Sequence, residues 1–337
     1  MEHPPATDAE LGTLGATGTV APASTDCVVC NHPITGRVYT VGDRSYCHEH
    51  YVRAFKRRGT WPTVWILFAG LVALGLLMQQ VGPALTPLLT GGTLIVAGLI
   101  LAVLPALIWL FVFRHLDQLE PENLHHLLGV MILGALVGGA IGDPLRRGVY
   151  GMDLWSESRW FWAIPIYTLT QGLLLALTIY ATVRFSAFLI HDFDERADGV
   201  IYGTAAGLGV AVFYNIRYLI DAGSLRIEVG VARTIIAALV FASIGGLIGY
   251  GLGQIWFEPH SIWYLPGIVL LAAFLTGIYE WLSSEAVSRS LGYTAWVSVL
   301  IAAAFGAVLF GVINVLVRSA IRETVATGTG PEVAAAQ

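Results

Sequence analysis

The chain has 337 residues, of which 56% are hydrophobic and only 12% are charged, and its mean hydropathy is +0.70. A soluble globular protein carries a charged fraction of about 25%, so this composition excludes that class and predicts an all-α polytopic membrane protein. The formal net charge is -5, and the sequence contains no basic patch that would suggest nucleic acid as a partner. The lipid bilayer is therefore the expected environment.

We expect four regions along the chain. The first is a tail rich in Ala, Thr, Gly and Pro, whose lack of hydrophobic periodicity predicts disorder. No N-terminal signal peptide is expected, because the first long apolar run begins only near Trp61. The regions are a disordered tail (1–24), a cytosolic zinc-binding module with a basic linker (25–58), a transmembrane domain (59–320) and a disordered C-terminal tail (321–337).

All three cysteines of the chain lie in one pattern, C-x2-C-x16-C-x2-H, within residues 27–50. Three thiolates and one imidazole complete the tetrahedral shell of Zn²⁺, and a closed shell of this kind leaves no position for a catalytic water. We therefore predict Zn²⁺ as a structural cofactor. The pattern resembles the second zinc finger of LIM domains. The predicted ligands are Cys27, Cys30, Cys47 and His50, with His48 as the alternative to His50.

The residues between the two ligand pairs predict a short hairpin, formed by 36–42 and 44–47. A module of this size is too small to bury a sufficient core without metal. The alternative is a disulfide with one spare thiol, which a cytosolic location and an odd number of cysteines disfavour. A cytosolic protein is a candidate partner of the module.

Eight apolar runs are long enough to cross a bilayer, which takes about 20 residues. The basic segment 53–58 precedes the first run, so both termini are expected in the cytosol and the protein in the cell membrane. Arg146 and Arg147 fall on the opposite side and weaken this bias. The runs are 61–81, 91–113, 124–142, 160–183, 199–220, 231–256, 263–283 and 293–317.

Three of these runs carry glycines in steps of four, which leaves one face of each helix without side chains. Such faces let helices approach closely inside a bilayer, so we expect these three helices to form a tightly packed central bundle. The ladders are Gly134–Gly138–Gly142, Gly199–Gly203–Gly207 and Gly245–Gly249–Gly253.

The segment 198–218 reads Asp-Gly-Val-Ile-Tyr-Gly-Thr-Ala-Ala-Gly-Leu-Gly-Val-Ala-Val-Phe-Tyr-Asn-Ile-Arg-Tyr. It resembles the signature DGxxYGxxxGLGFAxxEN of the PrsW family of intramembrane metalloproteases. A second segment, Asp117-Gln-Leu-Glu-Pro-Glu122, is similar to that family's Asp-x-x-Glu-Pro-Glu stretch. From the residues alone, Pro121 starts the next helix with Glu122 as a solvated residue near its positive end. The resemblance extends more weakly over 105–285 and implies a PrsW-like helical bundle.

The resemblance also implies a site that could hold a metal ion and its water. It would comprise a Glu-Glu-x-x-Lys motif, a glutamate before Asn215, a histidine in the next span and a His-x-x-x-Asp in the span after. In this chain only an acid survives, and spans four to eight contain no histidine, although a catalytic zinc site needs three protein ligands. The corresponding positions are degenerate: Thr170, Gln171, Leu174, Tyr214, Phe241, Thr276 and Glu280.

We therefore interpret the membrane domain as a protease-like pseudoenzyme that binds or scaffolds a transmembrane partner without cleaving it. Most of the replacements are neutral hydrogen-bonding groups, which can satisfy one another across helices without placing a charge in hydrocarbon. They either refill a former catalytic cavity or line a pocket for a small polar group or a substrate helix. The candidate pocket residues are Thr170, Tyr214, Asn215, Thr276 and Glu280.

Two other functions stay open. An active, diverged metalloprotease would use Glu280 with His125, His126 or His191 as cytosolic ligands. A small-solute transporter or ligand-binding membrane protein would use the pocket itself. An acid inside the membrane is costly and is a functional candidate for that reason. The structural alternatives for Glu280 are a snorkelling or protonated acid and an ion pair with Arg217 or Arg233.

Overall fold

The computed structural model of the chain describes two groups of residues. The first group belongs to the N-terminal region and the second to the membrane domain. Together they are 18–20, 26–27, 32–41, 44–49, 51, 66, 69–70, 73, 77, 80–81, 84, 92–116, 122–145, 160–186, 196–221, 227–283 and 295–327.

The N-terminal region contains a three-stranded antiparallel sheet with the order β1-β2-β3. Its strands are β1 (Gly18–Val20), β2 (Arg37–Val41) and β3 (Arg44–Tyr46). The predicted hairpin is confirmed, since β2 and β3 pair with Thr40 opposite Ser45. The predicted disorder of the first 24 residues does not extend to 18–20, because this short segment pairs its backbone with β2.

The membrane domain is helical, and within the described residues seven helical segments are long and apolar enough to cross a membrane. They confirm the second to eighth predicted spans, while the first, 61–81, lies outside the described residues except at isolated positions. The last helix runs beyond the predicted domain boundary at 320. The helices are α4 (Gly92–Leu116), α5 (Leu124–Val137), α6 (Trp160–Tyr167), α7 (Leu173–Phe185), α8 (Arg196–Asp221), α9 (Ile227–Phe257), α10 (Tyr264–Ser283) and α12 (Ala295–Thr327).

Two π-helical turns interrupt these spans. The turn η2 (Gly138–Gly142) extends α5, and η5 (Thr168–Gly172) joins α6 to α7 so that both belong to one span. A π-turn inserts an extra residue into the helix and is often found at functional sites. Sequence periodicity did not predict these turns, and η5 contains two of the degenerate positions, Thr170 and Gln171.

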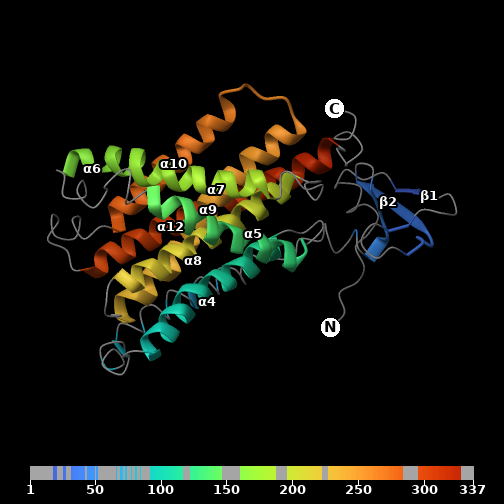
Figure 1. Cartoon of the computed structure of the whole chain (residues 1–337). Coiled ribbons are helices and arrows are strands. Elements are labelled where there is room, and N and C mark those ends of the chain that lie inside the picture. Colours follow the sequence, from blue (N-terminus) through green and yellow to red (C-terminus); the bar gives the residue numbers. More distant parts are fainter. Residues whose placement is uncertain are drawn as a thin grey trace.

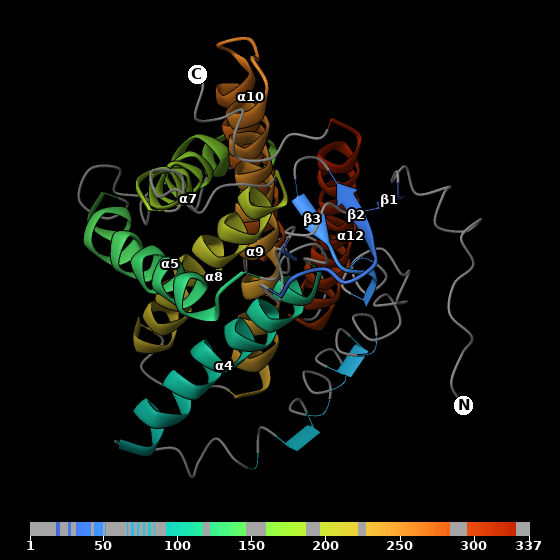
Figure 2. The same cartoon turned by 90° about the vertical axis from the view of Figure 1, so that its right-hand side faces the viewer.

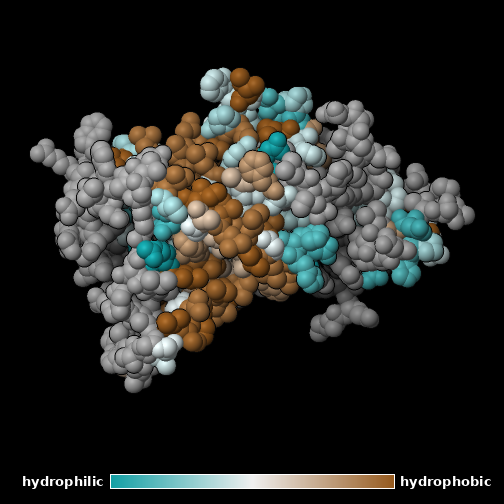
Figure 3. Space-filling model, in the orientation of Figure 1, coloured by the Kyte–Doolittle hydropathy of each residue, from teal (hydrophilic) through white to brown (hydrophobic). Residues whose placement is uncertain are grey.

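The helices α8 and α9 form the centre of the bundle (Figure 1). In their spans 83% and 89% of the residues are buried inside the protein, against 28% to 39% in the other five. Figure 2 shows α5 and α12 on opposite sides of this central pair. The remaining helices therefore present much of their surface to lipid, and Figure 3 shows a band of hydrophobic side chains across the visible face of the domain.

Glycines set the distance between the two central helices. Gly203 lies against the backbone of Gly245, and Gly207 lies against the backbone of Phe241, so that a Cβ atom at either glycine would overlap a carbonyl oxygen. The third ladder contributes through Gly134, whose added Cβ would lie 2.5 Å from the carbonyl oxygen of Ala206 in α8. The predicted packing of three glycine-faced helices is thus confirmed.

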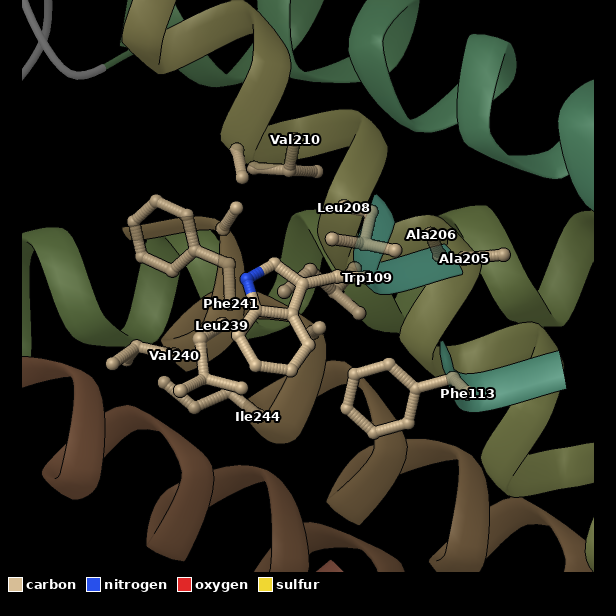
Figure 4. Packing of buried hydrophobic residues seen from close by; sticks show 14 of the residues in the cluster. Trp109, Phe113, Ala205, Ala206, Leu208, Val210, Leu239, Val240, Phe241 and Ile244 are labelled. Carbon is tan, nitrogen blue, oxygen red and sulfur yellow. The ribbon is translucent and has the colours of Figure 1, made fainter. Parts of the chain in front are cut away.

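Large aromatic side chains of α4 and α12 pack beside the central pair of helices. Trp109 of α4 is fully buried, and Figure 4 shows it beside side chains of α8 and α9 that include Leu208 and Leu239. Its ring centroid lies 5.6 Å from that of Phe310 in α12, and Phe113 completes the cluster at 5.6 Å from Phe310. These contacts hold α4 and α12 against the α8–α9 pair.

Candidate functional site

Three aromatic rings meet where α8, α9 and α10 come together. The ring centroids of Tyr214 and Phe241 are 6.4 Å apart, and those of Phe241 and Tyr279 are 5.8 Å apart in a T-shaped arrangement. Phe241 and Tyr279 are each only 3% exposed. The position at which the family resemblance implies a histidine is therefore occupied by a buried ring that packs against an aromatic neighbour on each flanking helix.

The threonines at the degenerate positions bond to their own helices. The Thr170 hydroxyl donates to the Ile166 carbonyl at 2.6 Å, and the Thr276 hydroxyl donates to the Ala272 carbonyl at 2.8 Å. Threonine commonly makes this bond one turn back along a helix, because the carbonyl is always within reach. The hydrogen bonds that we expected between helices are therefore not needed to satisfy these two hydroxyls.

Asn215 does make a bond between helices. Its side-chain nitrogen donates to the Thr234 carbonyl of α9 at 3.3 Å, and both residues are buried. The Thr234 hydroxyl in turn donates to the Val231 carbonyl at 3.0 Å. This contact adds a polar link to the glycine packing of α8 and α9.

The turn η5 lies against α10, which brings the first and last degenerate positions to one interface. Gly172 packs on the backbone of Ala273, and Gly277 packs on Thr168. Gln171 and Leu174 are half-buried beside this interface.

The Tyr214 hydroxyl points toward α5 and α7. A Cβ atom added at Gly142 would lie 3.2 Å from this hydroxyl and 3.4 Å from the Thr178 hydroxyl. The missing side chain of Gly142 therefore makes room for a phenol where the family resemblance implies a carboxylate.

Charged groups gather at the end of the bundle where α8 ends and α9 begins. Arg217 pairs with Asp143 through Nε and Oδ2 at 3.6 Å. Arg217 thus has an acidic partner in Asp143, a residue to which the sequence analysis assigned no role, and the ion pair between Glu280 and Arg217 stays a prediction. The sequence contained a clue to the ion pair with Asp143, because Asp143 and Arg217 lie at the ends of two predicted spans that reach the same side of the membrane. Arg233 and Glu280 both interact electrostatically with Tyr279.

The two segments that resemble the family signature meet at the opposite end of α8. The Tyr202 hydroxyl, from the first segment, donates to a carboxylate oxygen of Glu122, from the second, at 2.9 Å. Arg114 Nε donates to the Glu122 carbonyl at 2.8 Å. The prediction that Glu122 is simply solvated was therefore wrong, because the hydroxyl of Tyr202 in α8 reaches its carboxylate.

This arrangement also separates the ligands of the diverged-protease alternative. His125 and His126 are exposed at the start of α5, directly after Glu122, whereas His191 lies outside the described residues. Glu280 lies near the other end of α8, and the rise from Tyr202 to Tyr218 is about 24 Å. The structure therefore does not bring Glu280 together with these two histidines.

The N-terminal module places two of the predicted zinc ligands in turns. The Cys27 amide donates to the His32 carbonyl and the Tyr51 amide donates to the Cys47 carbonyl, both at 2.9 Å. Cys30 and His50 lie outside the described residues, and within the described part of the chain no three His, Cys, Asp or Glu side chains gather in a group that could hold a metal. The four-ligand zinc site therefore stays a prediction.

The alternative ligand, His48, is exposed, and its Nδ1 lies 2.9 Å from the Tyr39 hydroxyl. Tyr39 also stacks on Tyr51 with ring centroids 4.6 Å apart. Burial, and to a smaller extent the neighbouring Tyr39, raises the pKa of the Tyr51 phenol. His48 thus belongs to an aromatic cluster on the sheet.

The chain is similar to members of one protein family. Residues 93–309 match the family model described as PrsW family intramembrane metalloprotease. Protease PrsW of Geobacillus kaustophilus is 26% identical over 195 residues, which cover 53% of this chain and 76% of the relative. The proteins of the same name from Clostridioides difficile and Bacillus subtilis are each 25% identical, over 54% and 53% of this chain and 77% and 79% of their own lengths. No solved structure matches significantly.

Proposed function

Because the chain belongs to the PrsW family of intramembrane metalloproteases, its activity depends on what occupies the positions of the implied metal site, and we propose that it binds a membrane partner without cleaving it. The observation that carries this proposal is the ring of Phe241, which lies between Tyr214 and Tyr279. A phenyl ring can neither bind a metal ion nor move a proton.

The remaining groups support the same function. Metal-assisted hydrolysis requires ligands that leave one position open for water. Thr170 and Thr276 are neutral and already bond to carbonyl groups of their own helices. Glu280 is then the one carboxylate left among the degenerate positions, and one carboxylate does not form a metal site.

The scaffold around these positions has the features expected of a retained binding domain. The glycine contacts between α8 and α9 and the Tyr202–Glu122 hydrogen bond hold the signature segments in place. The apolar outer faces of α5, α7 and α10 offer a surface on which a transmembrane helix can pack through van der Waals contacts and small residues.

Reconstitution tests this proposal. The full-length protein is incorporated into liposomes together with single-span membrane proteins, and cleavage is followed by electrophoresis and mass spectrometry. The Bacillus subtilis relative serves as the reference in parallel liposomes. We expect binding of a span, measured by energy transfer between labels, without new peptide fragments.

A chelator-sensitive cleavage that disappears in Glu280→Gln would overturn the proposal in favour of a diverged protease. A rise in Tm with a small polar solute, lost in Tyr214→Phe or Asn215→Leu, would instead favour the transporter or ligand-binding function, since a ligand that binds only the folded state stabilises it.

For the N-terminal module, we propose a structural Zn²⁺ held by Cys27, Cys30, Cys47 and His50. The β2–β3 hairpin between the ligand pairs and the turns at Cys27 and Cys47 support it. The bound ion would supply folding free energy to a sheet too small for a core of its own. We place this module in the cytosol on the basis of the flanking basic residues and propose that it docks a cytosolic protein.

Metal analysis of the purified protein tests the module separately. We expect about one zinc ion per chain, lost in Cys27→Ala and His50→Ala and retained in His48→Ala. Zinc content that survives Cys27→Ala would contradict the proposed ligand set, and loss of zinc in His48→Ala alone would identify His48 as the fourth ligand.

A further inference from the structure

One arginine lies at the end of an apolar span of the central helix pair. The apolar span of α8 ends at Tyr218 and that of α9 begins at Arg233. The guanidinium carbon of Arg233 lies 4.1 Å from the centroid of the Tyr218 ring, and both side chains are half-buried. The ring thus holds a cation at the edge of the hydrocarbon region.

The contact with the ring is a cation–π contact, which does not replace a hydrogen bond from the guanidinium. The group carries five N–H donors in its own plane. In the described part of the chain, no hydrogen bond or ion pair engages the donors of Arg233. The other arginines of this pair of helices differ, because Arg196 pairs with Glu258 and Arg217 pairs with Asp143.

Among the described residues, no acid forms an ion pair with Arg233. Asp143 is engaged by Arg217. Glu280 and Arg233 both act electrostatically on the Tyr279 phenol, which also hydrogen-bonds with Ser283. No ion pair joins Arg233 to Glu280 among the described contacts. Within the described part of the chain, the N–H donors of Arg233 are therefore available to an external anion.

We propose that Arg233, which lies over the Tyr218 ring, binds the phosphate group of a phospholipid headgroup. An arginine at the end of a membrane span reaches the interface, where the phosphate groups of lipids lie. The planar donors of a guanidinium match two phosphate oxygens at once, which makes this pairing stronger than a single hydrogen bond. A lipid is the appropriate source of the phosphate, because Arg233 begins a transmembrane span and lipid headgroups lie at that depth. This site is independent of whether the protein cleaves a substrate.

The test compares a lipid with a phosphate-containing headgroup, a lipid without one, and phosphate alone. Full-length protein is purified in an uncharged detergent, and its Tm and its lipid adducts in native mass spectrometry are measured. The probes are phosphatidylglycerol, diacylglycerol with the same acyl chains, and inorganic phosphate. We expect phosphatidylglycerol to raise the Tm and to form adducts, and diacylglycerol to do neither.

Variants assign the effect to the site. In Arg233→Gln we expect phosphatidylglycerol affinity to fall about tenfold, because a charge-assisted bidentate contact is lost. Arg233→Lys retains part of the affinity through its charge. Arg318→Gln, at an exposed arginine of α12, serves as the matched control and behaves like the unmodified protein.

Two outcomes would overturn the proposal. Equal lipid affinity in Arg233→Gln and Arg318→Gln would show that Arg233 does not bind the headgroup. Stabilisation by inorganic phosphate as large as that by phosphatidylglycerol would assign the site to a soluble anion. Should Arg233→Gln fail to fold, the native adduct spectrum of Arg233→Lys against Arg318→Lys provides the same comparison.

Discussion

The central pair of helices and the peripheral helices differ in how they pack in a bilayer. In α8 and α9 more than four-fifths of each span is buried, whereas in α5 and α10 the buried share is 28% and 33%. Lipid tails are as apolar as leucine, so the hydrophobic effect does not drive helices together inside the membrane. The central pair is instead held by close backbone contacts at glycines, and the peripheral helices remain largely solvated by lipid.

The degenerate site spans both regions. Tyr214, Asn215 and Phe241 belong to the central pair, while Thr170 and Thr276 lie on peripheral helices. We therefore expect substitutions in the central pair to destabilise the fold and substitutions in the peripheral helices to leave it nearly unchanged. Thermal and denaturant unfolding of purified variants tests this expectation.

The largest effect is expected for Gly203→Val. The new side chain would collide with the backbone of Gly245, which cannot move away as a side chain can. We expect the free energy of unfolding to fall by about 3 kcal/mol or more. Gly129→Val in α5 is the control, since nothing lies within 4 Å of its added Cβ atom. Similar unfolding curves for the two variants would contradict the close contact of α8 with α9.

Phe241→Ala should have the next largest effect. The variant loses two aromatic contacts, with Tyr214 and with Tyr279. Each such pair contributes about 0.5 to 1.5 kcal/mol, so we expect a loss of about 1 to 3 kcal/mol. Phe274→Ala, on the lipid-facing side of α10, should change the unfolding free energy by less than about 0.5 kcal/mol. A Phe241→Ala variant as stable as Phe274→Ala would show that the rings do not support the site.

A smaller effect is expected for Arg196→Gln at the other end of the central pair. The Arg196–Glu258 ion pair is 2.7 Å long, with a side chain of Arg196 that is 3% exposed and one of Glu258 that is 46% exposed. Because water screens Glu258, we expect a loss of about 1 kcal/mol. Glu258→Gln should lose less, since an amide oxygen still accepts the hydrogen bond. An Arg196→Gln variant with unchanged Tm would place this pair among those that contribute nothing.

The smallest effects separate bonds between helices from bonds within one. Asn215→Leu removes the bond to the Thr234 carbonyl of α9, and such bonds contribute about 0.6 kcal/mol in membrane proteins. Thr276→Val removes a bond within α10 and should cost less than Asn215→Leu. Calorimetry on both variants checks the order, and a larger loss for Thr276→Val would reverse the assigned roles.

Much of the membrane domain was predictable because its signals are local. Apolar length located seven spans that the structure confirms, and the glycine spacing identified the faces that pack. The hairpin of the N-terminal module was predicted from the residues between the two ligand pairs, and β2 and β3 form it. The family resemblance pointed to Tyr214 and Phe241, and these residues do contact each other.

Other features depended on contacts between distant segments. The partner of Glu122 is Tyr202, eighty positions along the chain, and no periodicity connects them. Asp143 is an ion-pair partner of Arg217, seventy-four positions away along the chain. Thr170 and Thr276 could equally have bonded across helices, and only the helix geometry shows that their own carbonyl groups accept these bonds.

Composition and motif spacing are properties of the chain alone. They were therefore enough to predict a helical membrane domain of this family and to show that the last five spans contain no histidine. The tertiary structure decided how the vacated positions are used. The role of the Phe241 ring depends on Tyr214 and Tyr279, which pack against it from two other helices. Such packing depends on side chains that three different helices place in one volume.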